Sequence, residues 1–197
     1  MRDKWYSDNR DLVKWGALLT LAERYAAQHI LQVLYYRRSN WAQLELDGEE
    51  VPLPEPVVRH FRQATAISTI DAPVPVEVLA DTFMNREEYH RIVIDRIRTR
   101  TRSPGVVFLD PDTGLEARVS NLDHVLNNEL AALWKELQAG DLLVFYQHQT
   151  NRNGQPWVGP KKEQFERAIG IPVGASKLAR AERIARDVVL FYVQKPG

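Results

Sequence analysis

The stretch GVVFLDPDTGLE, residues 105–116, decides the fold class. It begins with an uninterrupted apolar run that ends at Asp110, which is the pattern of a strand buried on both faces. Two more carboxylates, Asp112 and Glu116, follow shortly after. Because ligands of open α/β sheets bind outside the carboxyl ends of the strands, the stretch predicts a buried strand with a candidate site at its end.

Helices and strands alternate on both sides of this stretch. Asp8 suits the N-cap of a first helix, since apolar residues recur at three- and four-residue spacing from Leu12 onward. Asp47-Gly48, inside the alternating segment 41–54, is the strongest hairpin signal in the chain. The predicted helices are 8–26, 54–67, 85–99, 122–138 (capped by Ser120 or Asn121), 160–169 and 176–185, and the predicted strands are 29–36, 74–83, 105–110, 141–149 and 187–194.

This order of elements gives the architecture. Strands that read as continuous apolar runs and alternate with helices indicate a mostly parallel sheet that is covered on both faces. We therefore expect an α/β fold, organised as a single Rossmann-like domain over residues 1–197, with the 41–54 hairpin at the edge of the sheet. A chain of 197 residues is long enough to bury a full core.

Composition and charge restrict the function. The chain has 26 Lys+Arg and 26 Asp+Glu, so no field of the whole molecule favours nucleic acid. The lack of cysteine excludes disulfides, zinc-thiolate sites and cysteine nucleophiles. No apolar run reaches the roughly 18 residues of a membrane span, and the N-terminal MRDKWYSDNRD lacks the apolar core of a signal peptide. We expect a cytoplasmic, bacterial-type protein without a membrane partner.

The carboxylates after the 105–110 strand are compatible with several chemistries. Asp110, Asp112 and Glu116 resemble part of a calcium loop, although its twelve-residue pattern is incomplete. The Asp-x-Asp spacing also resembles the first motif of haloacid-dehalogenase-type phosphatases, with Asp110 as nucleophile and magnesium between the carboxylates. In a methyltransferase-type loop, Asp110 would orient a substrate amino group. The structural alternative is that Asp110 only ends the strand and caps the turn.

Two other residues are candidate neighbours of Asp110. His148 stands at the end of FYQHQ (145–149), and it would serve as general base or metal ligand if that strand lies beside the Asp110 strand. Alternation predicts that Gln147 and Gln149 lie on the opposite face. Lys14 lies in the first helical turns, in SDNRDLVKWG (7–16). A polar strand end for His148 and a solvated helix face for Lys14 are the simpler interpretations.

Two basic runs, RIVIDRIRTRTR (91–102) and KLARAER (177–183), are the features that favour a nucleic-acid partner. Clustered arginines and lysines of this kind bind phosphates. Solvated helix faces explain the same pattern, and the zero net charge favours that explanation.

The order of motifs resembles that of Rossmann-like class I methyltransferases. The resemblance is carried by NRDLVKWGALLTLAERY (9–25), followed by a strand, and by FLDP (108–111) at the end of a later strand. It is strongest to bacterial large-subunit ribosomal RNA adenine methyltransferases, to three-Cys-motif partner proteins, and to short bacterial proteins without an assigned activity that share FLDPDTGLE and FYQHQTNR. It implies S-adenosylmethionine as cofactor, nucleic acid as partner, and catalytic roles for Asp110 and Lys14, with His148 nearby.

The chain departs from this family at two places. The segment after the first strand, YYRRSNWAQ (35–43), has no glycine where the family has a Gly-rich cofactor turn. Asp112 replaces the second proline of the family's Asp-Pro-Pro-aromatic motif.

Three hypotheses therefore stay open. The first is a relative of S-adenosylmethionine-dependent nucleic-acid methyltransferases with a degenerate cofactor site. The second is a metal-dependent phosphodiesterase, nuclease or phosphatase in which Asp110, Asp112 and Glu116 hold Mg²⁺ and His148 activates water. The third is a non-enzymatic binding or partner module.

Overall fold

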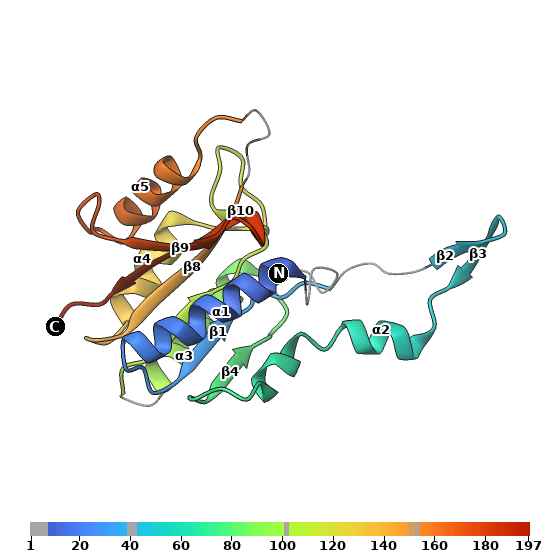
Figure 1. Cartoon of the computed structure of the whole chain (residues 1–197), viewed down its shortest axis with the longest axis horizontal. Coiled ribbons are helices and arrows are strands. Elements are labelled where there is room, and N and C mark those ends of the chain that lie inside the picture. The colour runs from blue at the N-terminus through green and yellow to red at the C-terminus, as the bar shows by residue number, and fades with distance from the viewer. Residues whose placement is uncertain (1–7, 39–42, 101–102, 150, 152–153) are drawn as a thin grey trace.

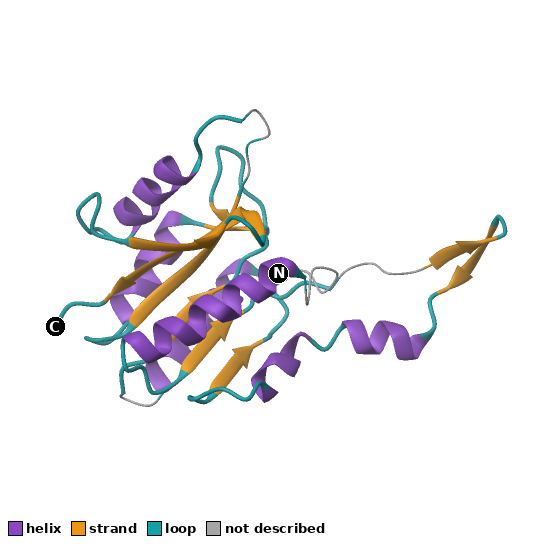
Figure 2. Cartoon of the chain, in the orientation of Figure 1, coloured by secondary structure: helices purple, strands orange, loops and turns teal. Residues whose placement is uncertain are grey.

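The computed structural model describes residues 8–38, 43–100, 103–149, 151 and 154–197, and it has a six-stranded sheet at its centre (Figures 1 and 2). The strand order is β4-β1-β5-β8-β10-β9. Its parallel part consists of β4 (Val76–Leu79), β1 (Ile30–Val33), β5 (Val106–Leu109) and β8 (Leu142–His148). The last two strands, β10 (Ala185–Gln194) and β9 (Lys177–Ala181), are each antiparallel to their neighbour. The expected α/β fold with a mostly parallel sheet is confirmed.

Helices cover both faces of this sheet, as expected. Helix α1 (Asn9–Arg24) packs on one face, and α3 (Arg86–Thr99), α4 (Asn127–Glu136) and α5 (Val158–Ala168) pack on the other (Figure 1). The alternation of β5 divides it between these two layers: Phe108 joins the α1 side and Leu109 the opposite side. Since every residue of β5 is buried, its apolar run reads as continuous in the sequence.

The predicted hairpin forms, but it is not part of the main sheet. Strands β2 (Gln43–Leu46) and β3 (Glu49–Pro52) pair with each other as a separate two-stranded sheet; residues 41–42 of the predicted hairpin lie outside the described part of the chain. Asp47 and Gly48 both have positive φ, 53° and 86°, as a tight hairpin turn requires. The hairpin was expected at the edge of the main sheet, and this expectation is wrong. The element that lies against the edge strand β4 is instead the 3₁₀ helix η2 (Ala64–Thr69). The short helix α2 (Glu55–Phe61) precedes it.

Two other predicted elements need correction. Residues 176–185 form strand β9 and the turn into β10 instead of a helix. Their Lys, Ala, Arg and Leu residues favour helix, but pairing with β10 outweighs this weak preference. Helix α4 begins at Asn127 rather than 122, since His124–Val125 form β7, which pairs with β6 (Gly114–Leu115). The Glu129 carboxylate accepts the Leu126 N–H at 2.9 Å at the true start of the helix, so neither Ser120 nor Asn121 is its cap.

No helix in the described ranges combines the length and the apolar character that crossing a bilayer requires.

A buried carboxylate, Glu166, holds the loop before β9 against α5. It accepts hydrogen bonds from the Ser176 hydroxyl at 2.6 Å and the Gly174 N–H at 2.9 Å, and it pairs with Lys162. Burial alone would raise the pKa of Glu166, but these donors lower it to about 2. Its ionised form therefore stabilises the fold above the unfolded-state pKa of about 4.5, and this contribution disappears as the pH falls toward 2.

We expect Glu166→Gln to destabilise the protein by about 3 kcal/mol at pH 7, since one pKa unit corresponds to about 1.4 kcal/mol. Urea unfolding of both proteins between pH 7 and pH 3 measures the difference. The difference should shrink below about pH 4.5. A difference that does not depend on pH would contradict the assigned role of the charge.

Candidate functional site

The carboxyl ends of β1 and β5 form the candidate site. The chain passes from β1 to β4 on one side and then to β5 on the other side, so the strand order reverses between β1 and β5. Such a reversal is where open α/β sheets bind their ligands. Asp110 is the first residue after β5, and its N–H donates to the Val33 carbonyl at 2.9 Å. The structure therefore places Asp110 at the edge where open α/β sheets commonly bind their ligands.

Three polar side chains are buried together at this point. Lys14 Nζ lies 2.9 Å from Asp110 Oδ1, and Gln32 Nε2 donates to Asp110 Oδ2 at 2.9 Å. Lys14 also pairs with Asp11 at 3.0 Å, and its ammonium lies 4.3 Å from the centre of the Tyr146 ring. Asp110 is 0% exposed, Lys14 4% and Gln32 3%. We call Lys14, Gln32 and Asp110 the buried triad; it links α1, β1 and β5.

Burial and pairing act in opposite directions on these groups. Burial raises the pKa of Asp110, and the nearby Lys14 ammonium opposes this effect. Burial would lower the pKa of Lys14, but the carboxylates of Asp110 and Asp11 outweigh it and raise that pKa. We assign Lys14 as charged, because two carboxylates contact its ammonium. A buried ion pair is costly to desolvate and contributes little net stability, so its presence at this edge of the sheet makes it a candidate for a functional role.

The structure brings Lys14 to Asp110 but gives His148 a different partner. His148 Nε2 lies 3.1 Å from Asp187 Oδ2, and Arg10 pairs with the same carboxylate oxygen at 2.5 Å. Arg10 also pairs with Asp8, the N-cap of α1, at 2.8 Å. Burial would raise the pKa of Asp187, but Arg10 holds it below its usual range. The side chains of Arg10, His148 and Asp187 are 32%, 32% and 30% exposed, so this polar cluster is accessible to solvent at the edge.

The three carboxylates of the proposed metal loop have separate partners. Asp112 pairs with Arg37 at 2.5 Å, and Glu116 accepts from the Asn127 N–H, at the start of α4, at 3.0 Å. Within the described part of the chain, no group of three or more histidines and carboxylates is placed to hold a metal ion. The magnesium site at Asp110, Asp112 and Glu116 stays a prediction, without support from this geometry.

The backbone conformation and the close packing at Gly114, the glycine of DPDTGLE, require a residue without a side chain. Its φ is 130°, and a Cβ at this position would overlap the Gln147 amide. Gln147 is 0% exposed and accepts the Leu115 N–H at 2.9 Å, on the face opposite His148, as alternation predicted. The glycine therefore lets the loop approach β8 closely.

Gly114→Ala should destabilise the protein by about 2 kcal/mol through backbone strain and overpacking, which lowers Tm by about 4–8 °C. Gly16→Ala is the matched control, because Gly16 lies exposed in α1 with nothing within 4 Å of its Cβ position. The control should be neutral or stabilising. Equal melting temperatures for the two variants would contradict the close approach.

Aromatic side chains close the described start of the turn after β1; residues 39–42 of the segment YYRRSNWAQ (35–43) lie outside the described part of the chain. Tyr35 adopts a left-handed φ of 46°, which glycine usually supplies, and its N–H donates to the Tyr89 hydroxyl at 2.9 Å. The rings of Tyr35, Phe83 and Tyr89 pack with centroids 4.9–5.3 Å apart and are buried. A Rossmann-type cofactor needs close approach to this turn, and here the Tyr89 hydroxyl already contacts the Tyr35 N–H, with Phe83 packed against both rings. The residues here do not fit S-adenosylmethionine bound in the family's manner.

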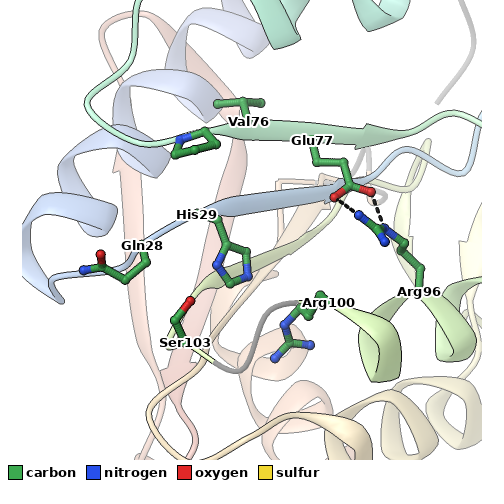
Figure 3. A pocket seen from close by; sticks show the side chains of 8 residues that line it. Gln28, His29, Val76, Glu77, Arg96, Arg100 and Ser103 are labelled. Carbon is green, nitrogen blue, oxygen red and sulfur yellow. Dashed lines mark hydrogen bonds and ion pairs between the residues drawn. The ribbon is translucent and has the colours of Figure 1, made fainter.

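A cavity of about 400 Å³ lies at the opposite end of the sheet, beside the start of β1 and β4 (Figure 3). Its charged side chains are already paired: Arg96 with Glu77, and Arg100 with Asp141. Arg98, in the same basic run, pairs with Glu136 at 2.7 Å. These three arginines of 91–102 therefore have intramolecular partners, which favours the structural interpretation of the run; Arg102 lies outside the described residues.

Several residues of the edge escaped sequence reasoning. Gln32 is a polar residue within the buried run HILQVLYY, and that interruption was a usable signal. Asp187 precedes the last apolar run without a motif around it. Tyr89 lies on a helix, and nothing in its local sequence indicates contact with the turn after β1.

The chain is similar to two solved structures at low sequence identity. No protein-family model matches the chain, and no curated protein matches it significantly. A DUF574 family protein from Streptomyces avermitilis MA-4680 is similar in structure, with a TM-score of 0.45 and 12% identity over 95% of this chain and 82% of that one. A candidate methyltransferase from Thermobifida fusca YX gives a TM-score of 0.44 and 11% identity over 96% of this chain and 80% of that one. We infer neither family nor activity from similarities of this size.

Proposed function

We propose that the protein is a relative of S-adenosylmethionine-dependent nucleic-acid methyltransferases in which the cofactor turn is degenerate, and that it uses the carboxyl edge of the sheet for binding. The observation that carries this proposal is the closed turn after β1, beside an intact buried triad. Aromatic rings contact the start of the turn that would receive the cofactor, whereas the Asp110 edge carries the charged pair with Lys14.

The buried triad acts as a positioning group in this proposal. Asp110 is fully covered, so it fixes α1 to the sheet through Lys14. That attachment presents the first turn of α1 to solvent, with Arg10 beside Asp187 and His148. Arginine binds phosphate through charge-assisted hydrogen bonds, so in this proposal a phosphate takes the place of the Asp187 carboxylate that now pairs with Arg10. A partly exposed imidazole donates to or accepts from a base edge. Nucleic acid is the ligand that the sequence resemblance implies for this surface.

Fluorescence anisotropy with labelled single-stranded RNA and DNA oligonucleotides tests this function. We expect binding by the wild-type protein and an approximately tenfold weaker Kd for Arg10→Ala. Arg167→Ala is the matched control, since Arg167 forms an exposed ion pair with Glu163 on α5, away from the edge. No binding by the wild-type protein, or equal effects of the two variants, would overturn the proposal.

An active methyltransferase is the second candidate, and the position of Asp110 at the strand-order reversal favours it. In that case the Asp110 carboxylate would accept a hydrogen bond from a substrate amino group. A substrate would have to displace the cover over Asp110 and open the turn at Tyr35.

A further inference from the structure

The hairpin has a mainly apolar face that the described residues leave partly exposed. In the β2–β3 register, Leu44 faces Val51 and Leu46 faces Glu49, so Leu44, Leu46 and Val51 share one face, with Glu49 at its end beside the turn. Leu46 is 56% exposed. The hairpin projects away from the main sheet (Figure 1). An isolated two-stranded hairpin is only marginally stable in water. We therefore expect another surface to cover this face of the hairpin.

The segment around the hairpin is strongly acidic. Residues 43–58, which we call the acidic arm, carry five exposed carboxylates and no lysine or arginine; the carboxylates are Glu45, Asp47, Glu49, Glu50 and Glu55. Within the hairpin, Glu45 faces Glu50 on the side opposite the leucines. Like charges directly opposite are destabilising, so a basic partner surface would relieve repulsion within the arm.

The free edge of the main sheet has the complementary properties. Strand β9 is the last strand of the sheet, and it has no further neighbour in the described part of the chain. The segment 177–186, which we call the basic edge, exposes four cations and one acid: Lys177, Arg180, Arg183, Arg186 and Glu182. It also exposes Leu178 and Ile184, 36% and 44%. A strand edge with unpaired backbone groups is a ready template for another chain.

We propose that two copies of this chain associate by exchanging arms, each acidic arm lying along the basic edge of the other copy. The arrangement is self-complementary, so it closes into a symmetric dimer in which both arms are used. The arm supplies exposed leucine and carboxylates, and the edge supplies exposed leucine, isoleucine and cations. The opposite charges steer the encounter and fix the partner, while the apolar side chains lose their contact with water.

Sedimentation velocity of the full chain over a range of concentrations is the test. The wild-type protein should form a dimer that weakens as salt rises, because exposed charges are screened. The arm variant Glu45→Lys/Glu49→Lys/Glu50→Lys and the edge variant Lys177→Glu/Arg180→Glu/Arg183→Glu should each weaken the dimer by about 100-fold. The control Glu23→Lys/Glu87→Lys/Asp95→Lys reverses three exposed acids outside the arm and should leave the dimer intact.

Mixing the two variants separates lost charge complementarity from misfolding. In the mixture, the reversed, basic arm of the arm variant meets the reversed, acidic edge of the edge variant. The native basic edge of the arm variant meets the native acidic arm of the edge variant, so the mixture should restore the dimer. A monomeric wild-type protein at all concentrations would overturn the proposal. Dimers that survive either reversal, or a mixture that stays monomeric, would overturn it equally.

Discussion

Replacing Lys14 by alanine is expected to destabilise the protein by about 3–5 kcal/mol, because breaking a buried pair leaves the other charge without compensation. Asp110 is 0% exposed, and of its two partners in the buried triad it would lose Lys14 and keep Gln32. For a domain of this size the loss corresponds to a fall in Tm of about 6–20 °C, which differential scanning calorimetry measures directly.

The double variant Lys14→Ala/Asp110→Ala distinguishes this cause from simple loss of packing. It removes the uncompensated charge together with its partner, so its destabilisation should be smaller than the sum of the two single effects. Additive effects would show that Lys14 and Asp110 do not interact energetically.

Asp141→Ala is the second substitution with a large expected effect. Asp141 is 0% exposed and pairs with Arg100, and it accepts the Gly105 N–H at 3.1 Å and the Gln138 N–H at 2.6 Å. Its removal leaves a buried guanidinium and two amide donors without their acceptor, so we expect a loss of about 3–5 kcal/mol. Chemical denaturation with urea gives the free energy of unfolding.

Glu136→Ala is the matched control for Asp141→Ala. The Arg98–Glu136 pair joins α3 to α4 close to the Arg100–Asp141 pair in the chain, but it is more exposed, with side chains 57% and 25% accessible. Exposed pairs contribute less than about 1 kcal/mol. If the two variants lost equal stability, burial would not be what makes the Arg100–Asp141 pair important.

Sequence patterns predicted the elements of the fold where local chemistry determines them. The apolar run of β5, the Asp8 cap of α1 and the Asp47-Gly48 turn each depend on neighbours in the chain, and each is confirmed. Strand β9 was missed because its residues favour helix, and only pairing with β10 makes them a strand. The position of the hairpin was missed because the cover of β4 by η2 has no local signal.

At the candidate site, too, local sequence patterns predicted some of the residues, and tertiary contacts determined the others. The end of β5 pointed to Asp110, and the family resemblance pointed to Lys14, but no spacing rule joins residues so distant in the sequence. Asp112 and Glu116 are close to Asp110 in the chain, yet the turn through Gly114 sends them to Arg37 and Asn127. His148 ends the neighbouring strand as expected, but it contacts Asp187, which only the pairing of β10 with β8 brings near. Sequence analysis therefore expected the side chains of Asp112, Glu116 and His148 to lie closer to Asp110 than they do, because it relied on nearness in the chain and on neighbouring strands.

The buried triad and the closed turn lead to one prediction about the cofactor: the protein does not bind S-adenosylmethionine. The sheet has a charged carboxyl edge at Lys14 and Asp110, while Tyr35, Phe83 and Tyr89 pack together beside the end of β1. Thermal unfolding of the purified protein, with and without saturating S-adenosylmethionine, tests this claim most directly. We predict no change in Tm. A ligand at 100 times its Kd stabilises by about 2.7 kcal/mol, so a rise of about 5–10 °C would show that the turn opens to hold the cofactor and would contradict the account.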